Sequence, residues 1–435
     1  MTSGFLWLAV SGGLLSFITP CVFPMVPITI AYFGDTSRDR RDTSAKALFF
    51  AVGIVGTYTL LGVFLALAFG ASGLNRFAAD PTVNLLLAVI FLAFAANLFG
   101  WMELRVPTGL VNAADRAARR QRDLSSASAA LVGATFTVTS LTCTAPIVGT
   151  LLVLASRGSW ATPLVGMFAY SVAFALPFYF LARAPQALQR MPRAGEWMRT
   201  VRVLVGILEV AAALKFASNA DVVLEWEVLT RGVVLIGWAA LAITAAVFLA
   251  RGLTKTKDRS VWRIVPAVGV AACVALSAWL ASGIRPRPLA GVEAFLPASI
   301  TNASARGTHG EQWMLNNFEG ALATARTTNR LVFVDFTGYT CTNCRWMEAN
   351  IFNRPDVSGA LAEFVLARLY TDGEGEIYER QQAFQENTFG TVALPLYAIL
   401  DSNGKVVDTL SGLTRDPVEF ISFLDRAKSK RVASN

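Results

Sequence analysis

Residues 331–344 read Leu-Val-Phe-Val-Asp-Phe-Thr-Gly-Tyr-Thr-Cys-Thr-Asn-Cys, an apolar run followed by two cysteines that are two residues apart. The run Leu331–Phe336 has the length and the β-branched and aromatic content of a buried strand. A helix is expected to open at the dithiol, from about Cys344. Two thiols at this spacing can close a disulfide across one helical turn, so the stretch predicts a strand, a dithiol and a helix in direct succession.

The position of the dithiol predicts the role of each cysteine. The free N–H groups at a helix N-terminus stabilise a thiolate and lower its pKa, so Cys341 is the expected nucleophile. Cys344, one turn inside the helix, is the expected resolving thiol that releases a mixed disulfide. Half of a zinc site and a structural disulfide are the alternatives. Zinc needs two more ligands, but this region contains no other Cys and the only His of the chain is His309. Redox chemistry is therefore favoured.

The segments around the dithiol predict a small three-layer α/β domain over residues 313–435. A linker rich in Pro, Ala, Ser, Thr and Gly precedes it over residues 284–312. The other expected elements are a helix near Trp313–Thr327, a strand near Phe364–Tyr370, a helix near Ile377–Glu386, the strands Leu396–Leu400 and Val406–Leu410, and a closing helix from Pro417.

The rest of the chain, residues 1–283, has the composition of a membrane domain. Of the 435 residues 54% are hydrophobic and only 16% are charged, which is too apolar for a soluble chain of this length. The first apolar run lacks a basic leading segment and continues through three prolines, so it is expected to stay in the mature protein. Apolar runs long enough to span a bilayer lie near 5–33, 46–70, 82–104, 129–155, 161–182, 201–218, 232–250 and 264–283.

The net charge of +8 belongs to this membrane half. Up to Gly283 there are 23 Lys and Arg against 13 Asp and Glu, and after it 15 against 17. Because basic residues beside apolar spans record membrane orientation, this excess argues against nucleic-acid binding. Alternate loops carry most of the cations, which predicts that these loops are cytoplasmic and that both termini of a multi-pass protein lie outside. In a bacterium the membrane would be the inner membrane and both termini would be periplasmic. These rich loops hold Arg38, Arg40, Arg41 and Lys46; Arg105, Arg116, Arg119, Arg120 and Arg122; Arg183, Arg190, Arg193, Arg199 and Arg202; and Arg251, Lys255, Lys257, Arg259 and Arg263.

Two membrane cysteines share a proline motif. Cys21 is followed by Pro24 in the first span, and Cys143 by Pro146 in the fourth. Spans one and four begin the halves of a 3+3 inverted repeat plus two helices, so the two thiols are expected to meet near the midplane. Prolines interrupt the backbone hydrogen bonds of a helix and can open a path to each thiol. Cys273 lacks such a motif and is read as a buried small hydrophobe.

The C-terminal segment resembles the thioredoxin superfamily. Val334-Asp-Phe336 precedes the dithiol at the family's interval, and Leu394-Pro395 stands just before a strand. The resemblance implies that Asp335 is the buried carboxylate that moves protons at the resolving cysteine, and that Pro395 is the cis-proline beside the active site. Thr340 departs from the family, which commonly has Trp before the first cysteine.

The membrane half resembles the DsbD/CcdA family of transmembrane thiol–disulfide reductases. The resemblance rests on Pro20–Pro27 and Thr142–Pro146, with Phe99–Leu104 and Leu208–Phe216 as further similar segments. It implies eight helical spans followed by an external thioredoxin-like domain. It also implies that cytoplasmic thioredoxin reduces a Cys21–Cys143 pair, which then reduces Cys341–Cys344 outside.

The expected clients are periplasmic thiol–disulfide proteins or apocytochrome c, in cytochrome c maturation, disulfide isomerisation or redox homeostasis. The family commonly begins with a further periplasmic domain that carries its own cysteine pair, which is not seen here, so a separate protein is expected to replace it or the C-terminal domain to reach clients directly. No nucleotide or haem motif is seen, so no cofactor or metal is expected beyond the thiols. The alternative is a transporter of a small thiol or metal with a regulatory thioredoxin-like domain. Glu209, an intramembrane carboxylate, is left open between a structural and a functional role.

Overall fold

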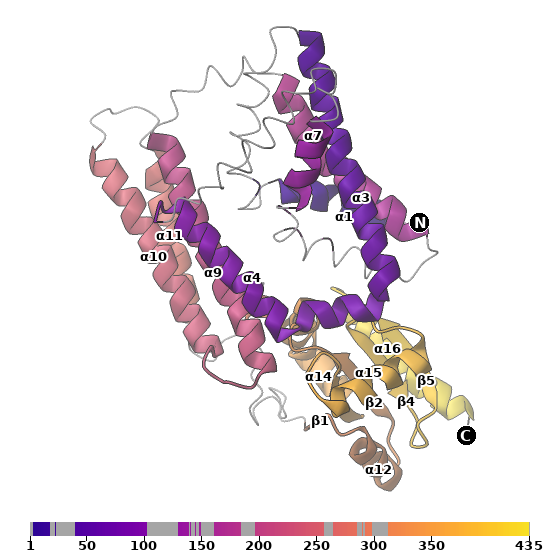
Figure 1. The fold of residues 1–435 in the computed structure, drawn as a ribbon. Helices are drawn as coiled ribbons and strands as arrows, with labels where there is room; N and C mark the ends of the chain where they lie inside the picture. Colours follow the sequence, from indigo (N-terminus) through magenta and orange to yellow (C-terminus); the bar gives the residue numbers. More distant parts are fainter. Residues whose placement is uncertain are drawn as a thin grey trace. The chain divides into compact units, whose positions relative to one another are not determined.

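The computed structural model describes residues 3–17, 22, 40–101, 129–138, 140, 144, 148, 161–183, 196–255, 264–284, 289, 292–297 and 312–434 (Figure 1). The chain forms two compact units, and each is described by itself. The first contains Met1–Leu74 and Ile90–Val210, and the second contains Asn75–Val89 and Ala211–Asn435.

Each of the eight predicted spans contains described helical residues. Among the described residues, four helices are long and apolar enough to cross a membrane: Ser44–Phe64, Pro81–Leu98, Arg231–Leu253 and Ile264–Ser282. Shorter apolar helices lie at Phe5–Ser16, Ala129–Val138 and Leu164–Phe180. The helices are α1 (Ser3–Ser16), α3 (Arg40–Ala79), α4 (Pro81–Leu98), α7 (Ala161–Arg183), α9 (Glu196–Val223), α10 (Arg231–Lys255) and α11 (Ile264–Ser282).

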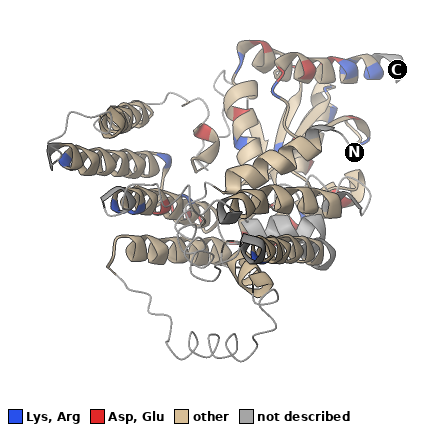
Figure 2. Ribbon diagram, turned by 90° about the horizontal axis from the view of Figure 1, so that it is seen from above, with Lys and Arg blue, Asp and Glu red and all other residues tan. Residues whose placement is uncertain are grey.

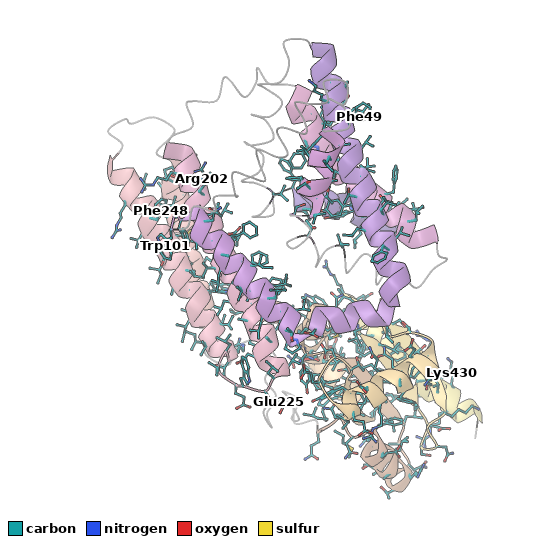
Figure 3. All side chains as sticks on the ribbon, viewed as in Figure 1. Phe49, Trp101, Arg202, Glu225, Phe248 and Lys430 are labelled. Carbon is teal, nitrogen blue, oxygen red and sulfur yellow. A yellow bond between two sulfur atoms is a disulfide. The ribbon has the colours of Figure 1, made fainter. Side chains whose placement is uncertain are left out.

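The outer faces of these helices are apolar. Leu60 on α3, Leu86 on α4 and Val265 on α11 are all more than half exposed, and Phe49 and Trp101 project outward (Figure 3). In Figure 2 the apolar helices are mostly uncharged, whereas α16 at the C-terminus carries acidic residues in its first part and basic residues towards its end. Exposed apolar surface on this scale is what a lipid-facing helix presents. The described helices therefore support a membrane domain.

The first unit has a core of aromatic side chains from α3, α7 and the segment around Phe136. Backbones approach closely there, because a Cβ at Gly53 of α3 would collide with the carbonyl of Ala130. Glycine at such a position permits tight helix packing. The core includes Phe50, Ile54, Tyr58, Phe136, Met167, Tyr170, Phe174 and Phe178.

In the second unit, the part of α9 from Ala211 onward, α10 and α11 are joined by hydrogen bonds between helices. The Trp238 indole donates to the carbonyl of Ala211 at 3.1 Å, and the Ser277 hydroxyl donates to the carbonyl of Ala239 at 3.1 Å. At the start of α10, Arg231 forms a bidentate ion pair with Glu293, with N···O distances of 2.7 and 2.9 Å. Glu293 lies in the short helix η2 (Glu293–Phe295), so this pair ties the segment after α11 to α10.

The C-terminal part is a five-stranded sheet in the order β1-β3-β2-β4-β5. Strand β3 pairs in parallel with β1 and β2, while β4 is antiparallel to β2 and β5. The elements are β1 (Trp313–Leu315), α12 (Phe318–Thr328), β2 (Val332–Thr337), α13 (Thr342–Met347), the π-helix η3 (Glu348–Phe352), α14 (Pro355–Leu361), β3 (Val365–Tyr370), α15 (Glu376–Phe389), β4 (Leu396–Leu400), β5 (Val406–Ser411) and α16 (Pro417–Ser434).

Three local expectations differ from the structure. Residues 313–315 form a strand rather than the start of a helix, because Asn316 has a φ of 50° and the Asn317 side chain caps α12 by accepting from the N–H of Gly320. Helix α14 was not predicted; seven residues with Pro355 at the first turn are too short for a periodic signal. The span expected over 82–104 ends at Leu98, where Gly100 has a φ of 77°.

Alternation along β2 decides which side chains face the dithiol. Val332, Val334 and Phe336 pack with residues of α12, while Phe333 packs on the other face with Met347 and α16. Because successive strand residues point to opposite faces, Asp335 lies on the same face as Phe333, towards α13. A strand that is apolar on both faces therefore presents one carboxylate beneath the dithiol helix.

Candidate functional site

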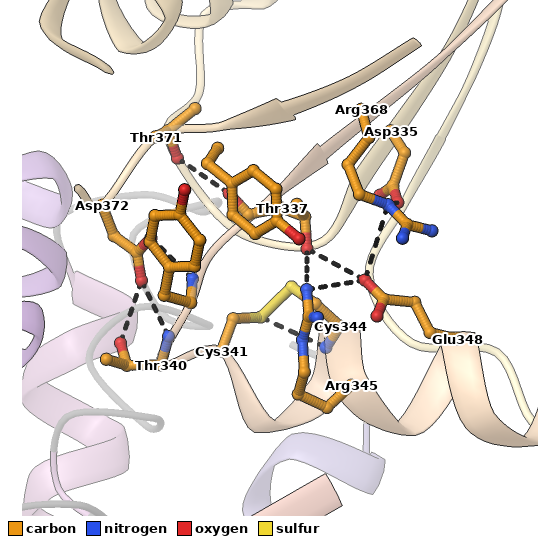
Figure 4. A network of polar contacts seen from close by, with 12 residues as sticks. Asp335, Thr337, Thr340, Cys341, Cys344, Arg345, Glu348, Arg368, Thr371 and Asp372 are labelled. Carbon is orange, nitrogen blue, oxygen red and sulfur yellow. Dashed lines mark hydrogen bonds and ion pairs between the residues drawn. A yellow bond between two sulfur atoms is a disulfide. The ribbon is translucent and has the colours of Figure 1, made fainter. Parts of the chain in front are cut away.

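The two cysteines after β2 are joined in a disulfide with a Cα–Cα distance of 5.3 Å (Figure 4). Cys341 caps the N-terminus of α13, and its sulfur accepts the backbone N–H of Cys344 at 3.2 Å. Cys344 is only 1% exposed, whereas Cys341 is partly exposed. The reachable sulfur is thus the one that a helix N-terminus stabilises as a thiolate, which is the arrangement that thiol–disulfide exchange requires.

A buried ion pair lies at the inner side of the dithiol helix. Arg368 of β3 donates to Asp335 at 2.9 Å, and both side chains are at least 92% buried. The two residues are register partners in the parallel pair β2–β3, which sets their spacing. The Arg368 guanidinium lies 4.2 Å from the centre of the Trp313 ring, so β1 also covers it.

A second ion pair extends this cluster towards the dithiol. Arg345 follows Cys344 directly, and it forms an ion pair with Glu348 at 2.6 Å and donates to the Thr337 hydroxyl at 3.0 Å. Glu348 also lies 3.8 Å from Arg368, so it connects the two cations (Figure 4). We call Asp335, Arg345, Glu348 and Arg368 the charged cluster.

Burial sets the proton affinity of Asp335. Desolvation raises the pKa of its carboxyl to about 6, although the neighbouring Arg368 guanidinium acts in the opposite direction, and Glu348 adds to the rise. A carboxyl with this pKa exchanges its proton close to neutral pH. Asp335 is therefore suited to accept or supply a proton on the inner side of the dithiol helix.

A further carboxylate holds the loop that leads into the dithiol. Asp372, two residues after β3, accepts hydrogen bonds from the N–H of Tyr339 at 2.7 Å and from the N–H and hydroxyl of Thr340, both at 3.0 Å. A Cβ at Gly338 would come within 2.6 Å of the Asp372 carboxylate and 3.1 Å of Leu394, so this position requires glycine. Burial raises the pKa of Asp372. The two residues before Cys341 are thus fixed by one side chain.

Thr340, which stands where the family commonly has tryptophan, and Tyr339 before it have different partners. The Thr340 hydroxyl donates to Asp372, while the ring of Tyr339 stacks on Tyr370 with centroids 4.0 Å apart. The Tyr339 hydroxyl lies 3.2 Å from that of Tyr378. Aromatic packing at this edge therefore comes from Tyr339, one residue earlier in the chain.

Pro395 directly precedes β4, which begins at Leu396. The Leu394–Pro395 peptide is cis, as the resemblance implied, and the carbonyl of Pro395 accepts the N–H of Gly412 at 2.8 Å. Leu394 lies against the Gly338 position, which links this turn to the loop before Cys341.

The membrane candidates lie mostly outside the described residues. Cys21, Pro24, Cys143 and Pro146 are all in this category, so their roles stay predictions. Cys273 is a free cysteine in α11 and is partly exposed. Glu209 in α9 is 1% exposed, and among the described residues its Oε2 atom has no hydrogen-bond partner.

Sequence reasoning missed Arg345, Glu348, Arg368 and Asp372, although two of them leave a signal. Arg368 is the one charged residue within the apolar strand β3, and a lone charge in a buried strand needs a partner. Glu348 stands four residues after Cys344, hence on the same side of a helix. Asp372 lies in a polar stretch, Thr371-Asp-Gly-Glu-Gly375, where nothing distinguishes it from a turn residue.

Fold and site together define a class: membrane proteins that carry a thioredoxin-like domain with a Cys-x-x-Cys disulfide. Residues 3–220 match the family of cytochrome c biogenesis protein transmembrane domains, and residues 313–402 match a thioredoxin-like family. The first match covers half of the chain, and the chain belongs to this DsbD transmembrane family.

Named relatives are similar over most of the chain. The thiol:disulfide interchange protein DsbD of Ralstonia nicotianae is 28% identical over 83% of the chain and 59% of its own length. The DsbD proteins of Vibrio vulnificus and Vibrio cholerae are 28% and 29% identical, over 92% and 83% of the chain and 64% and 57% of their own lengths. The chain thus spans about three fifths of the length of these relatives.

Proposed function

We propose that the protein is a protein-disulfide reductase that carries two electrons from cytoplasmic thioredoxin across the bacterial inner membrane to periplasmic disulfides. The observation that carries the proposal is the Cys341–Cys344 disulfide at the start of α13, in a chain that also contains a DsbD-type membrane domain. The named relatives are thiol:disulfide interchange proteins, which supports the same chemistry here.

The proposed route uses two cysteine pairs in series. Cys21 and Cys143, each followed by a proline three residues later, form the membrane pair that thioredoxin reduces. This pair then reduces Cys341–Cys344, with Cys341 as the nucleophile and Cys344 as the resolving thiol. Pro24 and Pro146 are proposed to open the path to the membrane thiols. Asp335 exchanges a proton near the resolving thiol, and Pro395 shapes the surface that faces a client.

The orientation follows from the loop charges. Four alternate loops hold most of the Lys and Arg of the membrane half, which supports cytoplasmic positions for these loops and periplasmic positions for both termini. Thioredoxin has a potential near −270 mV, and about 30 mV corresponds to roughly 1.4 kcal/mol for two electrons. An external dithiol that is modestly more oxidising than thioredoxin therefore suffices to draw electrons outward. Proposed clients are apocytochrome c and periplasmic thiol–disulfide proteins.

Thiol trapping in cells tests the route. The state of Cys341 and Cys344 is read with a mass-tagged maleimide in the wild type, in the Cys21→Ala and Cys143→Ala variants, and in cells without thioredoxin. We expect a reduced dithiol in the wild type alone. Cys273→Ala is the matched control, since this membrane cysteine lies outside the route and should leave the dithiol reduced. A dithiol that stays reduced in every variant and strain would exclude the relay and favour a transporter.

A further inference from the structure

The end of helix α9 packs against the loop that leads into the dithiol. This end of α9 and the α/β domain both belong to the second unit. Val222 and Val223, the last two residues of α9, form one buried apolar cluster with Tyr339 and Tyr370, and Tyr378 packs against it. We call these five residues the docking cluster. Its two valines come from the membrane half, whereas its three tyrosines come from the α/β domain.

The docking cluster is closed to water. Val222, Val223 and Tyr339 are 7 to 8% exposed, and Tyr370 is 3% exposed. The stacked rings of Tyr339 and Tyr370 lie 12° from parallel, and the Tyr378 ring meets that of Tyr339 edge to face at 6.0 Å. Three aromatic rings thus form one apolar patch beside the dithiol. Without α9, the side of this patch that the valines cover would face water, which is typical of a protein contact site.

The end of α9 is fixed by the turn that follows it. Asp221, which is 3% exposed, accepts the backbone N–H groups of Val228 and Leu229, both at 3.1 Å. These two hydrogen bonds tie the turn between α9 and α10 to the last turn of α9. Asp221 stands directly before Val222, so the docking valines extend from a backbone with a defined geometry.

A second element of the membrane half lies beside the dithiol helix. Helix η2 is a close neighbour of α13, the helix that Cys341 caps. Arg231 anchors η2 to the start of α10 through its bidentate pair with Glu293. Leu296, directly after η2, is 2% exposed and belongs to an apolar cluster with residues of α10. The dithiol end of the α/β domain therefore meets two elements that are both fixed to the helices of the second unit.

The proposed orientation places these elements on one side of the membrane. The turn after α9 and the segment after α11 both belong to the connections that are poor in Lys and Arg, which lie outside. The α/β domain follows α11, so it can reach the end of α9 without crossing the bilayer. Because both partners are parts of one chain, the linker keeps their effective concentration high, and a small contact suffices for docking.

We infer that the end of α9 and η2 form a docking site at which the thioredoxin-like domain receives electrons, and that a protein client must displace this contact to reach Cys341; this inference rests on the proposed function. Tyr339 stands two residues before Cys341. A protein interface covers about 800 Å² on each partner, so one that is centred on the sulfur of Cys341 extends over the docking cluster. The membrane domain and the clients therefore use the same face in turn.

Docking adds no covalent step to the proposed route. The same two electrons reach the Cys341–Cys344 disulfide, and the contact only holds the acceptor domain in one place while they do so. A fixed encounter geometry speeds such an exchange compared with random collisions along the linker. The members of the docking cluster are positioning residues, because none of them exchanges a proton or an electron in this scheme.

Photo-cross-linking tests the contact in the full chain. The photoreactive amino acid p-benzoylphenylalanine replaces Tyr378, the partly exposed member of the docking cluster, and cross-linked peptides are identified by mass spectrometry. We expect peptides that contain the end of α9. In the matched control the same amino acid replaces Val418, which is 67% exposed on α16 of the same domain. No cross-link to α9 from position 378, or equal yields from both positions, would overturn the inference.

Adducts at Cys341 test the competition with clients. All other cysteines are replaced by Ala, and Cys341 is joined through a disulfide either to glutathione or to a small single-cysteine protein, each added as its pyridyl disulfide. We expect the glutathione adduct to keep the cross-link between position 378 and α9, and the protein adduct to reduce it at least about fivefold. An equal yield with both adducts would show that a client and the docking site fit at once, which would overturn the inference.

Transfer kinetics test what the docking does. In proteoliposomes supplied with reduced thioredoxin, Val222→Asp and Val223→Asp place a charge in the apolar contact and should slow reduction of Cys341–Cys344 at least about tenfold. Val228→Asp is the matched control, since its side chain is 65% exposed near the same end of α9, outside the docking cluster. Its rate should stay within about twofold of the wild type.

Two further measurements exclude a folding defect as the cause. Reduction of Cys341–Cys344 by dithiothreitol needs no docking, so its rate should be no lower in the valine variants than in the wild type. Tyr378→Ala weakens the same contact from the α/β domain and leaves the membrane helices unchanged, so it should also slow transfer from thioredoxin. Transfer at the wild-type rate in Tyr378→Ala would overturn the inference.

The same assay separates this inference from the proposed function. If the wild type shows no transfer, or Cys143→Ala still transfers, the proposed function fails, whatever the cross-links show. If transfer requires Cys143 but is equally fast in the Val222, Val223 and Val228 variants, the inference alone fails.

Discussion

The α/β domain and the membrane half bury polar groups in different ways: the first has the charged cluster under Cys341–Cys344, and the second has a group of buried hydroxyls. We call these hydroxyls, those of Ser16, Tyr58, Ser140, Thr144 and Tyr170, the hydroxyl cluster. The first encloses four formal charges that neutralise one another, with Arg368 at 2.9 Å from Asp335 and Arg345 at 2.6 Å from Glu348. The second contains no ionised group and connects its hydroxyls in a chain of neutral hydrogen bonds.

The difference follows from the surroundings of each cluster. In the α/β domain a partly exposed loop and the helix N-terminus lie beside the charges, so ionised groups remain tolerable if they are paired. In a hydrocarbon environment even paired charges are costly, whereas neutral hydroxyls can satisfy one another by hydrogen bonds. The comparison predicts that the charged cluster lowers the stability of the α/β domain but allows a carboxyl there to exchange protons. It also predicts that the contribution of the cluster to stability varies with pH.

The largest expected effect comes from removing one cation. Arg368→Met leaves Asp335 without its partner and should lower the local free energy of unfolding by about 3–5 kcal/mol. Amide exchange of β2 and β3 in the full chain, measured by mass spectrometry, reports this loss. The double variant Asp335→Asn/Arg368→Met should recover more than half of it, because no unpaired charge then remains at position 335.

Arg354→Ala is the matched control for that loss. Arg354 pairs with Asp356 at 3.1 Å, but both side chains are nearly half exposed. Solvent screens an exposed pair and leaves it little effect on stability, so exchange in β2 and β3 should be unchanged. Equal effects of the Arg368 and Arg354 variants would show that the buried charges are not coupled as described.

The next effect is a pH dependence with a definite sign. The pKa of Asp335 is raised by burial from 3.8 to about 6, so between these values the folded chain holds more protons than the unfolded one. Stability from this group is therefore present below about pH 4 and is lost as the pH rises through about 6. The loss is on the order of 3 kcal/mol at most.

Asp335→Asn isolates this contribution. The variant should match the wild type in the amide exchange of β2 and β3 near pH 4 and be more stable than the wild type near pH 7.5. Its dithiol exchange should nevertheless be slower at neutral pH, since Asn cannot accept a proton. A variant that is less stable than the wild type at pH 7.5 would mean that the pair with Arg368 outweighs the burial of the carboxylate.

Most of the secondary structure around the charged cluster could be predicted from the sequence, because local sequence patterns determine it. The run Leu331–Phe336 is apolar on both faces, the dithiol follows it directly, and turn residues bound the hairpin at Asp401–Gly404. These elements formed where the patterns indicated. The pairing of Asp335 with Arg368 was not predictable, because it depends on the register of β2 and β3, which no local pattern encodes.

The hydroxyl cluster was even harder to predict from the sequence. Tyr58 and Ser140 are 82 positions apart, and Tyr170 and Ser16 are 154 apart, so only helix packing brings them together. Each hydroxyl taken alone reads as an ordinary membrane-helix residue. The cysteine–proline motifs were visible because their residues lie within three positions of one another, whereas the members of the hydroxyl cluster come from segments far apart in the chain.

The smallest expected effect tests whether position alone, without a cluster of charges, matters at the dithiol. Asp372→Ala removes the acceptor for the N–H groups of Tyr339 and Thr340. We expect the free energy of unfolding of the domain to fall by about 1–2 kcal/mol. The loss is limited because water can replace part of the lost hydrogen bonding at this partly exposed edge. The reactivity of Cys341 should fall by more than this loss suggests, since the loop that presents the sulfur is no longer fixed. Thr340→Val removes only the hydroxyl contact and should retain most of the reactivity. If Thr340→Val is as slow as Asp372→Ala, the side-chain hydroxyl of Thr340, rather than the two backbone N–H bonds to Asp372, positions Cys341.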